Sequence, residues 1–265
     1  MTADQLADWL ARFRYYRRPP SEQDIRAWLD HFAAGDQAVA EKVLDHVTVV
    51  SEEEIQRGYR IALEAIPGWN RRRDRRRGEW VFAGFGGPGQ SGSDMLRKFR
   101  EANRLSADRF DYLFSAIGNL ASLELTQQDT VVFVDDFSGT GDQVANLWPV
   151  HAELAGGARS FLILTAATQQ AVERILTLDD LDELLVAQVL GTEANVFSED
   201  NLQFTAAERA IILPYCVLSD PRNPTGFGSC GLLFVLSHKT PNNTLPILHA
   251  NKATWRGLFP RYLNV

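Results

Sequence analysis

The sequence has little of what several specialised classes of protein need. Cysteine occurs only twice in 265 residues, as Cys216 and Cys230, without ligand spacing around either one. A disulfide scaffold and a zinc module are therefore excluded. No apolar run approaches the roughly 20 residues that cross a bilayer, and the opening MTADQLADWLARFRYY lacks the apolar stretch of a signal peptide. These absences predict a cytoplasmic protein that makes no membrane contact.

Positive charge is also scarce, because the formal net charge is −7. This balance argues against a general nucleic-acid binder. Of the 27 basic residues only four are Lys. Guanidinium groups match phosphate oxygens, but a GC-rich coding sequence gives the same excess of Arg, and we favour that explanation. With 45% hydrophobic residues, the composition is that of a globular protein whose core needs no crosslinks.

Residues 1–77 predict a helical region followed by a charged connection. Apolar residues recur at helical spacing, and the pairs Ser21/Asp24 and Ser51/Glu54 resemble capping boxes. A block of like charges usually marks a solvated segment, so we interpret the block as a linker. Contact with nucleic acid is the less favoured alternative. The block consists of Arg71, Arg72, Arg73, Arg75, Arg76 and Arg77 around one Asp.

Residues 78–265 predict an α/β core. Short runs rich in Val, Ile, Leu and Phe alternate with helical segments, one of them over 108–120, and Thr205 with Glu208 forms another capping box. Such runs are typical of strands buried on both faces, and their alternation with helices indicates a mostly parallel sheet of about five strands flanked by helices. The runs are residues 80–84, 130–136, 160–165, 184–190 and 231–237.

The strongest motif is an acidic pair, Asp135 and Asp136, at the end of the run TVVFVDD. Ligands of parallel sheets bind beyond the carboxyl ends of the strands. Glycines there permit positive φ and close approach of a ligand, and N–H groups before a helix attract phosphate. We therefore expect a ribose 5-phosphate, with its hydroxyls or Mg²⁺ on the carboxylates. The substrate-binding residues would be Phe137, Ser138, Gly139, Thr140, Gly141, Asp142 and Gln143.

A second glycine-rich loop lies between the first core strand and a helix. Its candidate binding residues are Gly87, Gly89, Ser91, Gly92 and Ser93. Such a loop suits an anion, whereas the plain alternative is a flexible crossover. The spacing from Gly87 to Gly92 also matches a P-loop. We do not favour a P-loop NTPase, because Ser93 stands where its lysine belongs and the following acidic residue would repel a triphosphate.

The segment from Asp135 to Gln143 resembles the signature loop of type I phosphoribosyltransferases. The resemblance implies that Asp135 and Asp136 hold the ribose 2- and 3-hydroxyls of phosphoribosyl pyrophosphate (PRPP). Residues 138–142 would wrap its 5-phosphate, and residues 87–93 would hold its pyrophosphate. The chain departs from the pattern at Gly139, where several members carry an Asp as the general base for an incoming purine.

Near its C-terminal end the chain has the motif TPNNTLP after an apolar strand. Asn is a good turn former, so a plain turn is one interpretation; the other is that Asn242 or Asn243 binds a base or pyrophosphate as part of a hood. The order of the motifs is similar to a narrower group, PRTase-CE. These are phosphoribosyltransferase-like effectors predicted in bacterial conflict and antiphage systems. That group usually carries Trp where this chain has His249.

This resemblance implies an enzyme that acts at ribose C1 of PRPP or of a nucleotide. Mg²⁺ would be its cofactor, held at Asp135 and Asp136, and a protein of the same defence operon is a possible partner. The alternative hypothesis is a sensor that keeps the fold and binds the nucleotide without turnover. The missing side chain at Gly139 favours the sensor, and release of pyrophosphate or free base would favour the enzyme.

Overall fold

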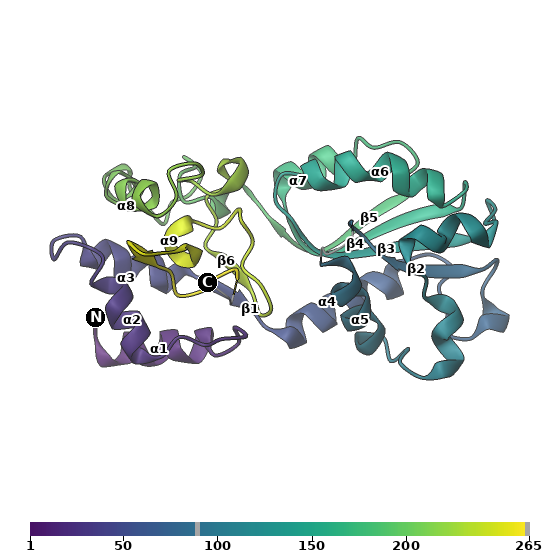
Figure 1. Ribbon diagram of the computed structural model, residues 1–265, viewed down its shortest axis with the longest axis horizontal. Helices are drawn as coiled ribbons and strands as arrows, with labels where there is room; N and C mark the ends of the chain where they lie inside the picture. The colour runs from purple at the N-terminus through teal and green to yellow at the C-terminus, as the bar shows by residue number, and fades with distance from the viewer. Residues whose placement is uncertain (88–90, 263–265) are drawn as a thin grey trace. The chain divides into compact units, whose positions relative to one another are not determined.

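The computed structural model describes residues 1–87 and 91–262, and the chain divides into two compact units (Figure 1). Unit 1 consists of Met1–Glu52 and Gly191–Val265, and unit 2 is the continuous stretch Glu53–Leu190. The boundary expected at residue 77 falls inside unit 2. Among the described residues, no helix is long and apolar enough to cross a membrane.

Unit 2 is built on a parallel sheet with the strand order β2-β3-β4-β5. Almost every side chain of β3 and β4 is buried, as expected for strands covered on both faces. Full burial of one Val, Leu, Ile or Phe side chain stabilises the fold by about 1.5–3 kcal/mol. The apolar part of β3 therefore fixes the position of its acidic end. The strands are β2 (Trp80–Gly84), β3 (Thr130–Ser138), β4 (Arg159–Thr168) and β5 (Glu183–Leu190).

Helices cover both faces of this sheet, which confirms the predicted α/β class (Figure 1). On the α6 and α7 side, a buried cluster includes Phe133 of the sheet and Trp148 of α6, whose rings meet edge to face at 5.5 Å. The helices are α6 (Asp142–Leu154) and α7 (Gln169–Ile175) on one face, and α4 (Glu52–Ala65) and α5 (Gly92–Ala102) on the other.

The single helix expected over residues 108–120 is wrong. Two 3₁₀ segments, η2 (Asp108–Leu113) and η3 (Ile117–Leu123), occupy this stretch. They are separated by Phe114, which has extended backbone and bridges in parallel to Phe82 of β2. Apolar periodicity alone does not distinguish one helix from two short turns around a single bridged residue.

Unit 1 combines residues from both ends of the chain in one core. β1 (Thr48–Val50) pairs in parallel with β6 (Phe234–Leu236). The Phe13 and Phe259 rings meet edge to face at 5.0 Å. The remaining elements are α1 (Ala3–Phe13), α2 (Glu22–Leu29), α3 (Gln37–His46), α8 (Ala206–Ser219), α9 (Pro246–His249), β7 (Asn251–Lys252), β8 (Trp255–Arg256), η4 (Thr192–Ala194) and η5 (Phe227–Ser229).

Two of the predicted capping boxes are confirmed in unit 1. Ser21 accepts a hydrogen bond from the backbone N–H of Asp24 at the start of α2, and Thr205 accepts one from Glu208 at the start of α8. In both cases the acidic side chain returns a bond to the capping residue. These reciprocal bonds satisfy N–H groups that the first helical turn leaves open.

Two expectations about organisation need correction. The run 231–237 supplies β6, which pairs with β1 in unit 1 and does not join the sheet of unit 2. The arginine block contains η1 (Arg73–Arg75) and lies inside unit 2, so it does not connect the two units. Both errors arise because pairing between distant segments leaves no mark on local sequence pattern.

Candidate functional site

The acidic pair lies at the carboxyl end of β3, where the register pairs Asp135 with Leu164 of β4. Only 4% of Asp135 and 6% of Asp136 is exposed to solvent. The pair was expected to face an open ligand site, so this burial is deeper than the sequence indicated. A ligand would have to displace the groups that cover the carboxylates.

One of these covering groups is the hydroxyl of Ser91, from the first glycine-rich loop. Its Oγ lies 2.9 Å from Oδ1 of Asp135 and 3.4 Å from Oδ1 of Asp136. Successive residues of a strand normally point to opposite faces, yet both carboxylates converge on this single oxygen. The structure therefore brings together three residues from two motifs that are separate in the sequence.

Burial raises the pKa of Asp135 well above its ordinary value, and the neighbouring charge of Asp136 adds to the effect. The hydrogen bond from Ser91 opposes the rise but does not cancel it. A buried carboxylate beside a second one favours its neutral form, because like charges at low dielectric repel. Strongly perturbed carboxylates of this kind are typical of functional sites.

Backbone contacts from three elements hold the pair in place. The hydroxyl of Tyr59 in α4 donates to the carbonyl oxygen of Asp135 at 3.1 Å, and Thr165 of β4 donates to the carbonyl oxygen of Asp136. The backbone N–H of Phe137 donates to Oδ1 of Asp136 at 2.7 Å. The first two bonds hold the backbone of the pair, and the third orients the Asp136 carboxylate.

The loop between β3 and α6 turns sharply at Gly141, which has φ of 76°. Of the two glycines expected to adopt positive φ, Gly141 does so and Gly139 does not. Thr140 donates to Oδ2 of Asp142 at 2.7 Å, and Arg174 of α7 pairs with Oδ1 of Asp142 at 2.8 Å. The loop therefore packs between the start of α6 and α7.

The remaining residues of this motif have different surroundings. The side chains of Ser138 and Thr140 are buried, whereas Phe137 is half-buried and Gln143 is exposed. Thr168 of β4 donates to the carbonyl oxygen of Gly139. The turn is thus fixed by β4 on one side and opens toward solvent at the first turn of α6.

In the first glycine-rich loop, Gly87 is half-buried and Gly89 lies outside the described residues. A Cβ on Gly92 would stand 2.2 Å from the carbonyl oxygen of Phe85, so close backbone packing accounts for this glycine. Ser93 is exposed in the first turn of α5. Ser91 brings a side chain of this loop to the acidic pair.

The two asparagines predicted as a hood belong to unit 1, whereas the acidic pair belongs to unit 2. Asn243 is buried, and its Nδ2 donates to the carbonyl oxygen of Phe227 at 2.9 Å and contacts the Cys230 sulfur at 3.3 Å. The turn interpretation therefore accounts for Asn243. Asn242 is half-buried and its backbone carbonyl accepts from Phe227 at 2.8 Å, which leaves its amide for another role.

The acidic pair offers a small donor set for a cation. Within residues 1–87 and 91–262, no group of three or more His, Cys, Asp or Glu is arranged to hold a metal. Mg²⁺ usually takes one or two carboxylates and completes its shell with water and substrate phosphates. The convergence of Asp135 and Asp136 on one oxygen position fits that donor set.

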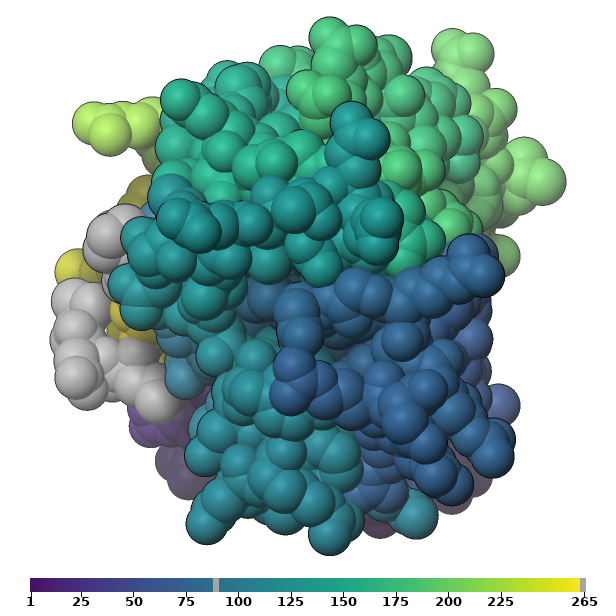
Figure 2. Space-filling view, turned by 90° about the vertical axis from the view of Figure 1, so that its right-hand side faces the viewer, coloured from purple at the N-terminus to yellow at the C-terminus, as the bar shows by residue number. Residues whose placement is uncertain are grey.

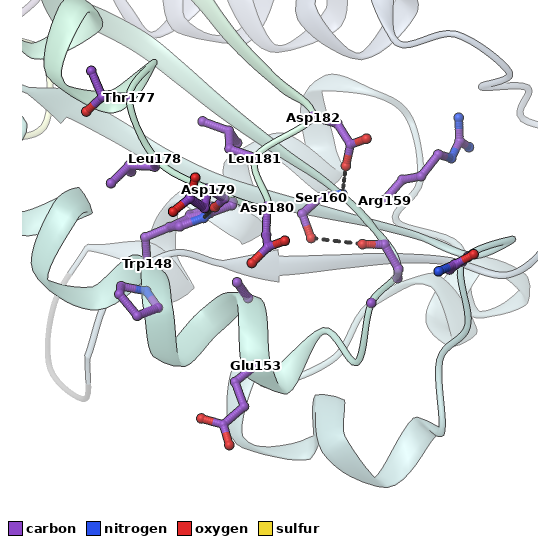
Figure 3. A pocket seen from close by; sticks show the side chains of 15 residues that line it. Trp148, Glu153, Arg159, Ser160, Thr177, Leu178, Asp179, Asp180, Leu181 and Asp182 are labelled. Atoms are coloured by element: carbon purple, nitrogen blue, oxygen red, sulfur yellow. Dashed lines mark hydrogen bonds between the residues drawn. The ribbon is translucent and has the colours of Figure 1, made fainter.

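A pocket of about 820 Å³ lies at the opposite edge of the sheet, near the starts of β4 and β5 (Figure 3). Its carboxylates include Asp182, whose Oδ2 accepts from the backbone N–H of Ser160 at 2.7 Å. The carbonyl of Asp179 accepts from the Trp148 indole at 2.8 Å. Ligands of parallel sheets bind at the other edge, so we assign these groups to holding the connection between β4 and β5.

Sequence reasoning missed Tyr59, Thr165, Thr168 and Arg174. The two threonines interrupt the apolar run of β4 at i and i+3, which is a usable signal that this strand end serves a polar site. Tyr59 fits the apolar face of a helix and Arg174 a solvated one, so pattern alone could not select either residue.

Comparison with known proteins agrees with this geometry. The model of the PRTase-CE family matches residues 25–261, which includes both glycine-rich loops, the acidic pair and the TPNNTLP motif. No curated protein matches the chain.

Proposed function

This chain belongs to the PRTase-CE family of phosphoribosyltransferase-like effectors, and on that premise we propose that it binds PRPP or a nucleotide at the end of β3 and acts at ribose C1. One observation carries the proposal. A hydroxyl group, that of Ser91, is recognised by both carboxylates of the acidic pair. The 2- and 3-hydroxyls of a ribose offer the same chemistry and would replace the Ser91 hydroxyl.

The 5-phosphate would lie at the start of α6. Gly141 precedes this helix without a side chain that could cap it, and its φ is left-handed. The N-terminus of a helix carries a partial positive charge, and its first N–H groups have no partner within the helix. A dianionic phosphate is stabilised there by both effects.

Asp135 and Asp136 are the residues that would hold Mg²⁺. When bound, the ion would neutralise charge on the pyrophosphate and so favour its departure. The other roles at the site belong to side chains of the protein. The carboxylates orient the ribose, and in their ionised form they would stabilise the positive charge that develops on the sugar ring as the C1 bond breaks.

Residue 139 bears on the acceptor at ribose C1. At Gly139 this chain has no side chain that could remove a proton from an incoming base, and the carbonyl of Gly139 is bonded to Thr168. This observation favours a second candidate, a sensor of the same fold that binds PRPP or nucleotide without turnover.

Calorimetry with PRPP and Mg²⁺ on the full chain tests the proposal. We expect saturable binding by the wild type and its loss in Asp135→Asn/Asp136→Asn, with the fold retained by circular dichroism. The control is Asp179→Asn/Asp180→Asn, which removes the same charge at the opposite edge of the sheet. Undiminished binding by the first variant would refute the site, and loss in both variants would show a nonspecific charge effect.

Product analysis separates the two candidates. Release of pyrophosphate from PRPP, or of free base from a nucleotide, supports the enzyme. Tight binding without either product supports the sensor. The family also leads us to propose a role as an effector in a bacterial antiphage system, with a protein encoded nearby as partner. Growth arrest on expression, relieved by the Asp135→Asn/Asp136→Asn variant, is the expected cellular result.

A further inference from the structure

Arg71, the first residue of the arginine block 71–77, lines a hollow in unit 2. A pocket of about 380 Å³ is lined by Arg60, Leu63 and Glu64 of α4, Trp69 and Arg71 before η1, and Ala102, Asn103 and Arg104 at the end of α5. Arg71 donates to the carbonyl oxygen of Arg104 at 2.6 Å, which connects the block to α5. Figure 2 shows this side of unit 2, with the block in blue beside the teal residues that follow α5.

Aromatic rings hold several of the guanidinium groups in fixed positions. Arg73 and Arg76 lie 5.1 and 5.8 Å from the Tyr112 ring centroid, and Arg76 also lies 5.1 Å from that of Trp69. Arg76 donates to the Tyr112 hydroxyl at 2.8 Å. Cation–π contacts of this kind order a long side chain. The block therefore contacts aromatic residues of unit 2 and is not a free linker, while its side chains other than the half-buried Arg76 stay exposed to solvent.

Much of the positive charge on this surface is not neutralised by the protein. Arg72 pairs with Asp74 and Arg73 with Glu79. On this surface four further arginines have side chains without a hydrogen bond, ion pair or ring contact to the described residues. They are Arg60 and Arg104 in the hollow, and Arg75 and Arg77 in the block.

The chemistry of this surface favours a ligand that carries several phosphate groups in a row. Arginine binds phosphate in a fork geometry and stacks on planar rings, and a row of arginines suits a ligand that repeats its charge. Bases of a single strand can stack on exposed guanidinium planes and on aromatic rings such as Tyr112, which is 43% exposed. The apolar residues that line the hollow are at most half-exposed, so the hollow offers no side chain for insertion into a membrane.

We propose that this surface, consisting of the hollow and residues 71–77, binds single-stranded nucleic acid through its phosphates. The inference goes beyond the proposed function and does not rest on it, because none of its residues takes part in the sugar-phosphate site.

The test measures binding of labelled 20-nucleotide DNA and RNA strands to the full chain by fluorescence anisotropy. We expect the Arg75→Glu/Arg77→Glu variant to weaken binding at least tenfold and Arg60→Gln/Arg104→Gln to weaken it by a smaller factor. The salt dependence should also flatten, by roughly 0.7 in the slope of log K against log salt for each phosphate that the variant no longer binds.

The matched control is Arg18→Glu/Arg222→Glu, the same change of charge at two exposed arginines of unit 1. Thermal unfolding and PRPP calorimetry show whether each variant keeps its fold and the separate ligand site. Equal weakening in the control, unchanged binding in the Arg75→Glu/Arg77→Glu variant, or tighter binding to duplex DNA or to phosphatidylserine vesicles would overturn the proposal.

Discussion

The hydroxyl oxygen of Ser91 lies 2.9 Å from Oδ1 of Asp135, in a site where that carboxyl is nearly inaccessible to solvent. This hydrogen bond joins the first glycine-rich loop to the end of β3. It also shows that a hydroxyl of the protein itself can satisfy the carboxylate. Substitution of either residue should therefore change the stability of the protein, and substitution of Ser91 should also change its affinity for a ribose.

Asp135→Asn is expected to stabilise the protein at neutral pH. Because the folded-state pKa of Asp135 is raised, the folded protein retains a proton that the unfolded chain has released. Stability is therefore lost as the pH rises from the ordinary value of 3.8 toward the raised one. Thermal unfolding should show a higher midpoint for the variant at about pH 8, with the gain vanishing at about pH 3. A lower midpoint at both pH values would contradict this account, and Asp182→Asn serves as the control carboxylate.

Ser91→Ala is expected to lower the stability of the ligand-free protein and to tighten PRPP binding. Loss of the hydroxyl removes a partner from two buried carboxylates, which costs about 1–3 kcal/mol. The same loss removes the group that the ribose must displace, so affinity should rise about fivefold. Calorimetry and thermal unfolding measure the two effects. Ser106→Ala, at an exposed position of unit 2 outside both loops, should change neither, and weaker PRPP binding by Ser91→Ala would show that the hydroxyl helps to hold the ligand.

Gly141→Ala and Gly157→Ala separate backbone strain from a role in binding. Both glycines have positive φ, of 76° and 84°, so each substitution carries a backbone cost of about 1–2 kcal/mol. A Cβ on Gly141 would also press on Arg174 at 3.1 Å, whereas at Gly157 no described atom lies within 4 Å. We expect the first variant to lose more stability, by chemical denaturation, and to lose phosphate affinity. If both variants changed PRPP affinity equally, the proposal that the phosphate binds at the start of α6 would be wrong.

Asn243→Ala and Asn242→Ala distinguish a structural asparagine from a ligand-binding one. Asn243 is buried and donates to the part-buried carbonyl of Phe227, so its loss removes this bond and costs about 1–3 kcal/mol. Asn242→Ala should leave stability within about 0.5 kcal/mol of the wild type. If residue 242 contributes to a hood, its substitution lowers PRPP affinity without unfolding, and unchanged affinity would assign both asparagines to the turn.

Local pattern predicted a large part of this fold. The runs at 80–84, 130–136, 160–165 and 184–190 became neighbouring parallel strands, because buried strands need continuous apolar sequence. The run at 231–237 looked the same and pairs elsewhere. Strand partners are chosen by contacts between distant residues, and these leave no trace in the composition of the strand.

The candidate site was predictable to a similar degree. The acidic pair and the small residues after it stood out by type and order, whereas their burial under Ser91 did not. The hydrogen bond depends on a side chain 44 positions away, brought near because adjacent parallel strands end at the same edge. Tyr59 could not be predicted because its ring matches the apolar face of a helix, although its hydroxyl donates to the carbonyl oxygen of Asp135.

The parallel pairing of β1 with β6 has a consequence for biosynthesis. Unit 2 emerges from the ribosome as one continuous stretch, whereas the first 52 residues wait for a strand made about 180 positions later. Because domains generally fold as units during translation, the acidic pair and the strands around it would form before the N-terminal helices find their partner. A ribosome stalled well beyond residue 190 would thus carry a folded unit 2 and also helices whose apolar faces are still exposed to chaperones.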